Sequence, residues 1–175
     1  MAMDLSRSLN GAVAGAAGAA VWAAQQPLDK RVFGTAYDDV ELLGKLAVRD
    51  STWPAAGLAA HLANGALFGA AYAHARPFLP GPPLVRAITA AMAENFASWP
   101  LVRLVDSHHP ARADLPRLAG NRRALAQATW RHLVFAVVMG ELERRLNAPS
   151  AAEEPPPVPV SSNGHGNIEM AVGAA

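Results

Sequence analysis

Polar and ionisable side chains interrupt four stretches of this sequence that are otherwise apolar. They are Gln25, Gln26, His61, Asn64, Glu94, Asn95, Arg131 and His132. In apolar surroundings such groups are costly unless they pair with one another, so they are the first candidates for chemistry. A glutamate and two histidines can exchange protons near physiological pH, because histidine titrates there without any perturbation.

The spacing of these residues indicates that they can meet. His61 lies seven residues after Pro54, and His132 lies eight residues after Ala124. At a rise of ~1.5 Å per residue, helices that start at one face of a bundle would hold both histidines ~11 Å deep. Glu94 is in the middle of the third apolar stretch, where Arg131 can reach it if the third and fourth stretches pack antiparallel. We therefore predict an interior polar cluster of His61, Asn64, Glu94, Asn95, Arg131 and His132.

Three interpretations of this cluster are open. The favoured one is structural, because polar contacts between membrane helices are common and contribute only ~0.6 kcal/mol each on average. The alternative is proton sensing, or transport of a small solute or ion, through Glu94, His61 and His132. A more remote alternative is a haem with the two histidines as axial ligands.

The sequence shows no enzyme motif. It has no Ser-His-Asp order, no phosphate-binding glycine loop and no HExxH. It has no cysteine, so disulfides and thiolate sites are excluded. Asp106, His108 and His109 form a second cluster, which we interpret as a polar turn rather than a metal site. We predict no enzyme activity, no catalytic residue, no metal and no cofactor.

The elements that must position the cluster are the four apolar stretches, at about residues 9–28, 54–75, 82–105 and 124–142. A bilayer core of ~30 Å needs about 20 helical residues. Apolar residues make up 51% of the chain and charged residues 17%, below the ~25% of ordinary soluble domains. From Gly11 to Ala24 no polar side chain occurs, whereas a helix of a soluble bundle shows a polar face.

These observations predict an all-α fold, an integral membrane bundle of four transmembrane helices over residues 1–147. Residues 148–175 are rich in proline, serine and glycine, which predicts a disordered tail. Two GxxxG pairs, Gly11 with Gly15 and Gly65 with Gly69, predict close helix packing. "NGAVAGAA" (10–17) and "NGALFGAA" (64–71) match at six of eight positions. The bundle is therefore interpreted as two duplicated helical hairpins.

Two long polar loops, residues 29–53 and 106–123, separate the members of each hairpin. Nine lysines and arginines lie in or beside these loops and five lie at the other end. The positive-inside rule then places both loops in the cytoplasm. In the first loop, Asp38 and Glu41 form a capping-box pattern, which predicts a short amphipathic helix. The second contains two prolines and is predicted to be irregular. A net charge of +1 gives no basic field for nucleic acid.

Four segments carry a family resemblance: "QQPLDKR", "HLANGALFGAAYAHARPFLP", "FASWPL" and "RHLVFAVVMGELERRL". With the glycine-spaced first stretch, they make the chain resemble the YagU-like family of bacterial inner-membrane proteins between Gly11 and Arg145. The resemblance implies a polytopic inner-membrane protein of about four helices and carries over no catalytic residue. We therefore expect a structural or accessory membrane component whose partner is the lipid bilayer, with a homo-oligomer or a larger membrane complex left open.

Overall fold

The structure is a computed structural model that describes residues 5–148, and within that range it is helical without a strand. The helices are α1 (Leu5–Phe33), α2 (Asp39–Ala47), α3 (Trp53–Ala75), α4 (Pro83–Ser98), α5 (Val102–His108) and α6 (Arg122–Leu146), with 3-10 turns η1 (Arg76–Phe78) and η2 (Trp99–Leu101). The predicted all-α class is confirmed. The predicted disordered tail falls almost entirely on residues 149–175, outside the described residues.

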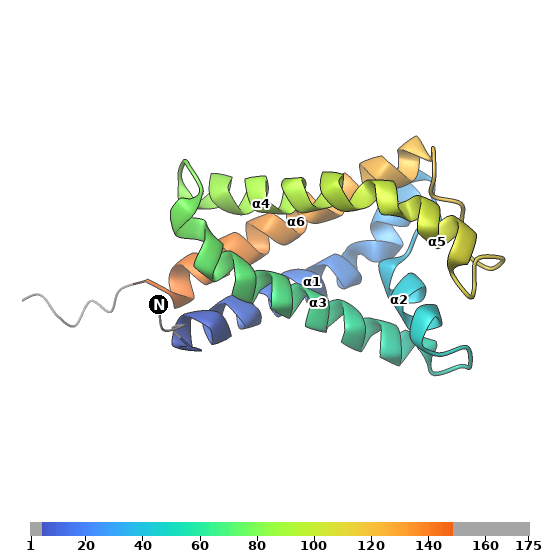
Figure 1. Cartoon of the computed structure of the whole chain (residues 1–175), viewed down its shortest axis with the longest axis horizontal. Coiled ribbons are helices and arrows are strands. Elements are labelled where there is room, and N and C mark those ends of the chain that lie inside the picture. The colour runs from blue at the N-terminus through green and yellow to red at the C-terminus, as the bar shows by residue number, and fades with distance from the viewer. Residues whose placement is uncertain (1–4, 149–175) are drawn as a thin grey trace, which may run out of the picture.

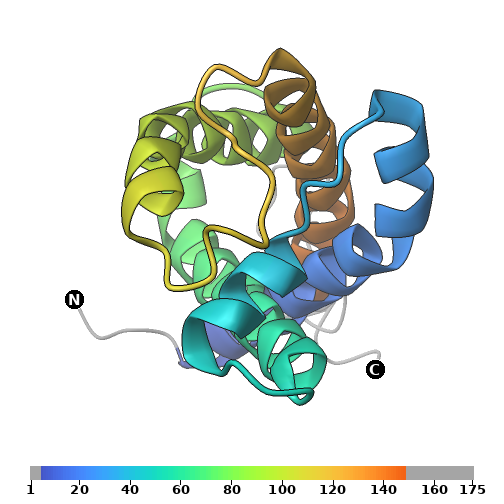
Figure 2. The same ribbon diagram turned by 90° about the vertical axis from the view of Figure 1, so that its right-hand side faces the viewer.

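Four long helices, α1, α3, α4 and α6, run along the long axis of the molecule (Figure 1). α1 packs against both α3 and α6, and α6 packs against α4. α3 and α4 are joined through η1 at one end and diverge toward the other (Figure 1). Both predicted loops lie at the end that faces the viewer in Figure 2, where α2 covers α3. The pairing of α1 with α3 and of α4 with α6 agrees with two hairpins, while their duplication stays a prediction.

Two predicted helix boundaries were wrong. α1 continues through Pro27 to Phe33 instead of ending near Leu28. The third apolar stretch, predicted as one helix over 82–105, is divided at Trp99–Leu101 into α4 and α5. Pro100 lies at this break and accounts for it, because proline has no backbone N–H to donate to the preceding turn and its ring crowds that turn.

The predicted helix in the first loop is confirmed. The Asp38 side chain accepts a hydrogen bond of 3.0 Å from the Glu41 backbone N–H, as a helix N-cap does. The helix lies on the bundle, because a Cβ on Gly44 would meet the Trp53 carbonyl of α3 within 3.0 Å. The second loop, between α5 and α6, is irregular as predicted.

The two GxxxG pairs pack against each other. A Cβ added to any of Gly11, Gly15, Gly65 or Gly69 would come within 3.0 Å of an atom of the facing helix. Gly11 faces Gly69, and Gly15 faces Gly65, so the backbones of α1 and α3 are in direct contact. The four glycines therefore lie at the contact between α1 and α3, where their spacing predicted close packing.

The helical hydropathy gives no support to the predicted transmembrane helices. Among residues 5–148, no helix is both long enough and, on average, apolar enough to qualify as a membrane span. The four predicted segments are therefore present as helices, namely α1, α3, α4 with α5, and α6. None of these helices has both the length and the mean hydropathy of a membrane span.

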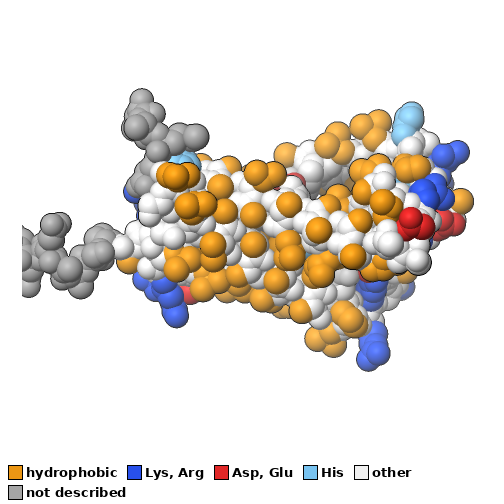
Figure 3. Space-filling model, turned by 90° about the horizontal axis from the view of Figure 1, so that it is seen from below, with side chains coloured by type: hydrophobic (Ala, Val, Ile, Leu, Met, Phe, Trp, Pro, Cys, Tyr) orange, Lys and Arg blue, Asp and Glu red, His pale blue; other side chains and the backbone are white. Residues whose placement is uncertain are grey.

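Polar side chains are concentrated inside the bundle. The largest side chains with less than 2% exposure are Arg131, Leu118, Met139, Gln127, Glu143, Asn95 and Asp29, so five of these seven are polar. In the middle of the long helices, at residues 9–28, 54–75, 83–98 and 124–140, the exposed residues are apolar except Asn64, Thr89 and Glu94. We call these exposed apolar residues the apolar belt. Figure 3 shows the belt on one face of the molecule, with charged side chains gathered toward the two ends.

Candidate functional site

Arg131 of α6 is at the centre of the buried polar network. Its side chain has 0% exposure and makes a two-pronged ion pair with Asp29 of α1, with Nε–Oδ2 and Nη2–Oδ1 distances of 2.6 Å. Its third nitrogen, Nη1, donates to Asp39 Oδ2 at 2.8 Å. A guanidinium suits this role because its planar fork can satisfy two carboxylates at once. The network thus ties α1, α6 and the start of α2 together.

Three further side chains complete the hydrogen bonds of the two carboxylates. Gln127 Nε2 donates to Asp29 at 2.7 Å, and Trp22 Nε1 donates to Asp39 at 3.0 Å. The Tyr37 hydroxyl donates to Asp39 Oδ1 at 2.5 Å. Burial, with the adjacent Asp39 carboxylate, raises the pKa of Tyr37 well above its ordinary value, so this phenol stays protonated and neutral.

The prediction that Arg131 contacts Glu94 was wrong. α4 and α6 do pack together, but the residue that faces Glu94 is His132, with Nε2 2.7 Å from Oε2. Arg131 is one residue earlier, which on a helix turns its side chain by about 100° toward α1. There the two aspartates provide a better charge balance than one glutamate. His132 also donates from Nδ1 to the Ala128 carbonyl at 2.8 Å.

A cavity of about 320 Å³ lies beside this network. Four of the six predicted cluster residues line it, His61, Asn64, Glu94 and His132. Residues of α1, α2, α3, α4, α6 and the Tyr37 segment contribute to its wall. These four residues, from three separate apolar stretches, therefore lie around one cavity. The cluster was predicted to be interior, but Asn64 and Glu94 are exposed, because they lie at the outer part of the cavity wall, and of the four only His61 is buried.

The remaining predicted residues lie apart from the cavity. Asn95 is buried and donates to Thr129 Oγ1 at 3.1 Å, which links α4 to α6. Gln25 accepts from Trp130 Nε1 at 3.0 Å. Gln26 is 6% exposed, and its Nε2 atom has no hydrogen-bond partner among the described residues. These side chains join helices or fill space and do not reach the cavity wall.

His61 is the cavity residue with an unused polar atom. It is 6% exposed, its ring meets the Ala19 carbonyl, and its Nε2 atom is buried without a partner among residues 5–148. The Trp22 indole lies edge-on to both histidines, with ring centroids 5.3 Å from His61 and 4.6 Å from His132. The aromatic side chains of Phe68 and Phe135 continue this wall.

The arrangement gives no support to the haem alternative. Both ring nitrogens of His132 are engaged, one with the Ala128 carbonyl and one with Glu94. Trp22 contacts both imidazoles. For His132 to bind a haem iron through Nε2, its contact with Glu94 would have to be broken.

No family model, curated protein or solved structure matches this chain. Membership in the YagU-like family therefore stays a prediction.

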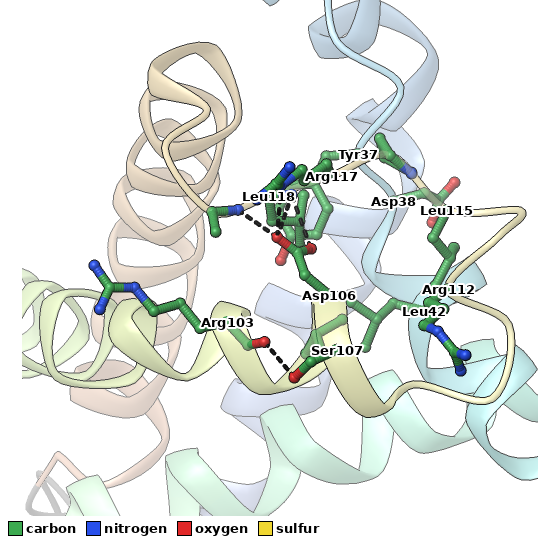
Figure 4. Close-up of a pocket in the computed structure, with 13 residues that line it drawn as sticks. Tyr37, Asp38, Leu42, Arg103, Asp106, Ser107, Arg112, Leu115, Arg117 and Leu118 are labelled. Carbon is green, nitrogen blue, oxygen red and sulfur yellow. Dashed lines mark hydrogen bonds and ion pairs between the residues drawn. The ribbon is translucent and has the colours of Figure 1, made fainter.

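A second cavity, of about 460 Å³, lies under the loop between α5 and α6 (Figure 4). Asp106 organises it by accepting from the backbone N–H groups of Leu118 and Ala119, at 2.9 Å and 2.8 Å. The side chains of Arg103 and Arg112 point away from each other in Figure 4, so they do not converge on a ligand. The role of Asp106 is to hold the loop.

The predicted Asp106, His108 and His109 cluster is separated by the fold. His109 is buried and bonds the Leu42 carbonyl at 3.0 Å, while His108 contacts Ser107 at 2.6 Å. Within residues 5–148, no group of three or more histidine, aspartate or glutamate side chains is placed to hold a metal ion.

Sequence reasoning missed Asp29, Asp39, Trp22, Tyr37 and Gln127. Asp29 falls in the predicted loop 29–53, because the first apolar stretch ends near residue 28. The available signal was the spacing of Gln25, Gln26 and Asp29, which places polar residues three or four positions apart on one continuing helix. Nothing local identifies Asp39 as a partner of Arg131, because 92 residues separate them.

Proposed function

We propose that the chain is a polytopic membrane component, of the kind that the YagU-like resemblance implies, with a structural or accessory role. The observation that carries this proposal is the apolar belt, combined with the polar interior of the same helices. In water, this distribution would expose apolar side chains and bury charged ones. In lipid, it places apolar side chains against acyl chains and pairs the polar groups with one another.

The dimensions of the belt support this proposal. α3 has 23 residues, about 34 Å at ~1.5 Å per residue, and a hydrocarbon core is ~30 Å thick. The large exposed belt residues include Leu9, Val13, Leu67, Phe96 and Val137. Charged side chains lie mostly beyond the belt at its two ends, where lipid headgroups and water can solvate them.

The low hydropathy of the individual helices is consistent with this distribution. Mean hydropathy includes every residue of a helix, and here the polar residues are on the buried side, where lipid does not reach them. Alanine and glycine, which are only weakly apolar, fill much of the remainder. For a helix packed in a bundle, lipid contacts only the exposed face, so the hydropathy of that face is the relevant quantity.

Cysteine labelling tests this proposal directly, because the natural chain has no cysteine and so gives no background. Ser6→Cys and Ser51→Cys place a single exposed thiol at opposite ends, and Leu67→Cys places one in the belt. With loops in the cytoplasm, an impermeant maleimide added to intact cells should label Ser6→Cys and leave Ser51→Cys unlabelled until the cells are opened. Leu67→Cys should resist labelling throughout.

Release of the protein by a carbonate wash, or ready labelling of Leu67→Cys in intact membranes, would contradict the proposal. Labelling of Ser51→Cys in intact cells, with protection of Ser6→Cys, would keep the membrane placement and reverse the orientation.

A second candidate function is proton sensing, and the observation that favours it is the contact between Glu94 and His132. The Ala128 carbonyl only accepts, so His132 Nδ1 must carry a proton. The 2.7 Å contact between Nε2 and Glu94 then holds one further proton, whichever of the two groups owns it. Glu94 is 44% exposed in its side chain, so this proton can exchange with the surroundings.

A further inference from the structure

We propose that the cavity between Trp22, His61, Glu94 and His132 binds a small organic ammonium ion, a primary amine attached to an apolar group. This inference concerns the cavity itself and does not depend on where the bundle resides. It names a ligand class for a site whose functional role is otherwise open.

The size and shape of the site suit a small molecule. Its volume is about 320 Å³, at the lower end of the ~300–1,000 Å³ typical of ligand pockets. Residues of both α3 and α4 line it, and these two helices are joined at one end and diverge toward the other (Figure 1). Asn64 and Glu94 are exposed residues at its wall, and His61 is buried.

The wall contains an unpartnered polar atom, His61 Nε2, which is buried without a hydrogen-bond partner among residues 5–148. In the neutral tautomer that carries its proton on Nδ1, Nε2 presents a lone pair and accepts a hydrogen bond. A buried acceptor without a donor is destabilising, because it has lost its hydrogen bonds to water without replacement. A ligand that supplies an N–H donor would remove this destabilisation.

The neighbouring polar groups are also acceptors. Glu94 contributes a carboxylate to the cavity wall, and Asn64 contributes an amide oxygen. The Asp39 carboxylate also lines the cavity and adds negative charge, but its oxygens already accept from Tyr37, Trp22 and Arg131. No lysine or arginine is among the lining residues within 5–148. An ammonium group, with three N–H donors and a positive charge, matches several acceptors at once.

The charge balance around the cavity favours a cation. Three carboxylates, Asp29, Asp39 and Glu94, are countered by Arg131 and, when protonated, by His132. Tyr37 is neutral, since its phenol stays protonated. The site therefore carries at least one uncompensated negative charge, which repels an anionic ligand.

The apolar part of the ligand is specified by the aromatic wall. Trp22, Phe68 and Phe135 line the cavity, with the Phe68 and Phe135 ring centroids 5.4 Å apart. Aromatic rings attract a nearby cation and also contact an apolar substituent favourably. A phenylalkyl ammonium ion combines both features at a size that the cavity holds.

Calorimetric titration of the purified full chain tests this proposal, with phenethylammonium as the probe and protein-free detergent micelles as the blank. The neutral isostere 2-phenylethanol and the anion phenylacetate serve as ligand controls. We expect saturable 1:1 binding of the amine, at least ten-fold weaker binding of the alcohol, and no binding of phenylacetate. Equal affinity for amine and alcohol, or no saturable binding of the amine, would overturn the proposal.

Two variants locate the site. Glu94→Gln keeps the shape of the side chain and removes its charge, and should weaken binding of the amine at least ten-fold. Glu141→Gln is the matched control, because Glu141 has a side-chain exposure of 40% against 44% for Glu94 and lies outside the cavity. If Glu94→Gln does not fold, Asn64→Ala removes an exposed acceptor and should weaken binding several-fold. Unchanged binding in a folded cavity variant would refute the assignment.

Discussion

Arg131 is the residue at which the buried polar contacts converge. It contacts Asp29 and Asp39 directly, and the same carboxylates accept from Gln127, Trp22 and Tyr37. Removing one member of a buried ion pair leaves an uncompensated charge, whereas exposed pairs contribute little. The residues of this network should therefore be far more sensitive to substitution than the charged residues at the ends of the bundle.

Arg131→Met tests the network, because it leaves two buried carboxylates without a cation. We expect a loss of about 3–5 kcal/mol in the free energy of unfolding, measured as a lower midpoint of thermal unfolding in detergent. Asp29→Asn should be milder, since Arg131 keeps Asp39. The matched control is Arg144→Met, which breaks an exposed pair with Glu141 and should change the midpoint little. Equal effects of the buried and exposed substitutions would contradict the role given to Arg131.

Glu94→Gln tests the proton held between Glu94 and His132. Protonated histidine quenches the fluorescence of an adjacent indole, and the Trp22 and His132 rings are 4.6 Å apart. The pH response of the emission should differ between the wild type and Glu94→Gln, because the variant replaces the carboxylate that contacts His132 with a neutral amide. Protein abundance should stay near the wild-type level, since Glu94 is half-exposed.

Asp39, His61 and Tyr37 also face Trp22 in this cavity, so His132→Gln is needed to assign the response. Loss of the pH response in that variant would identify His132 as its source. A fall in abundance of Glu94→Gln, with an unchanged pH response, would favour a purely structural role for the contact.

At the scale of elements, the contact between α1 and α3 depends on four glycines. Their facing backbones leave no space for a side chain, since a Cβ on Gly15 would lie within 3.0 Å of the Gly65 carbonyl. α6 approaches α4 in a similar manner, where a Cβ on Gly140 would lie 2.5 Å from the Ala87 Cβ. Small residues therefore set the separation of both hairpins.

Gly15→Leu should separate α1 from α3. Overpacking of this kind costs about 1–3 kcal/mol, and more is expected here because the atom in the way is a backbone carbonyl. Ala20→Leu on the exposed side of the same helix is the control and should be tolerated. Thermal unfolding of the two variants, with cellular abundance as a second readout, distinguishes a packing role from a general intolerance of large residues in α1.

At the scale of the whole molecule, the distribution of polarity distinguishes a bundle for lipid from one for water. Leu67 is 72% exposed in the belt, and Leu46 is 57% exposed on α2, near the loops. A lysine at the bilayer centre costs about 3 kcal/mol in insertion. Leu67→Lys should therefore reduce the membrane-inserted fraction, while Leu46→Lys should not. The measurement is detergent-extractable protein relative to total, and an improved yield of water-dispersed Leu67→Lys would contradict the membrane proposal.

The sequence alone determined the local features of this protein. The Asp38 and Glu41 capping pattern identified α2, the glycine spacing identified the surface shared by α1 and α3, and the apolar stretches located four long helices. It also placed His61 and His132 at a similar depth in the bundle. These features follow from helical periodicity and backbone sterics, which neighbouring residues decide.

The tertiary structure alone decided the pairing. Asp29 and Asp39 meet Arg131 across 102 and 92 residues, and His132 takes the place beside Glu94 that Arg131 was expected to occupy. A shift of one residue on α6 turns a side chain toward a different helix. The partner of a buried charge is therefore fixed by how helices rotate and pack, and that rotation depends on contacts distributed over the whole bundle.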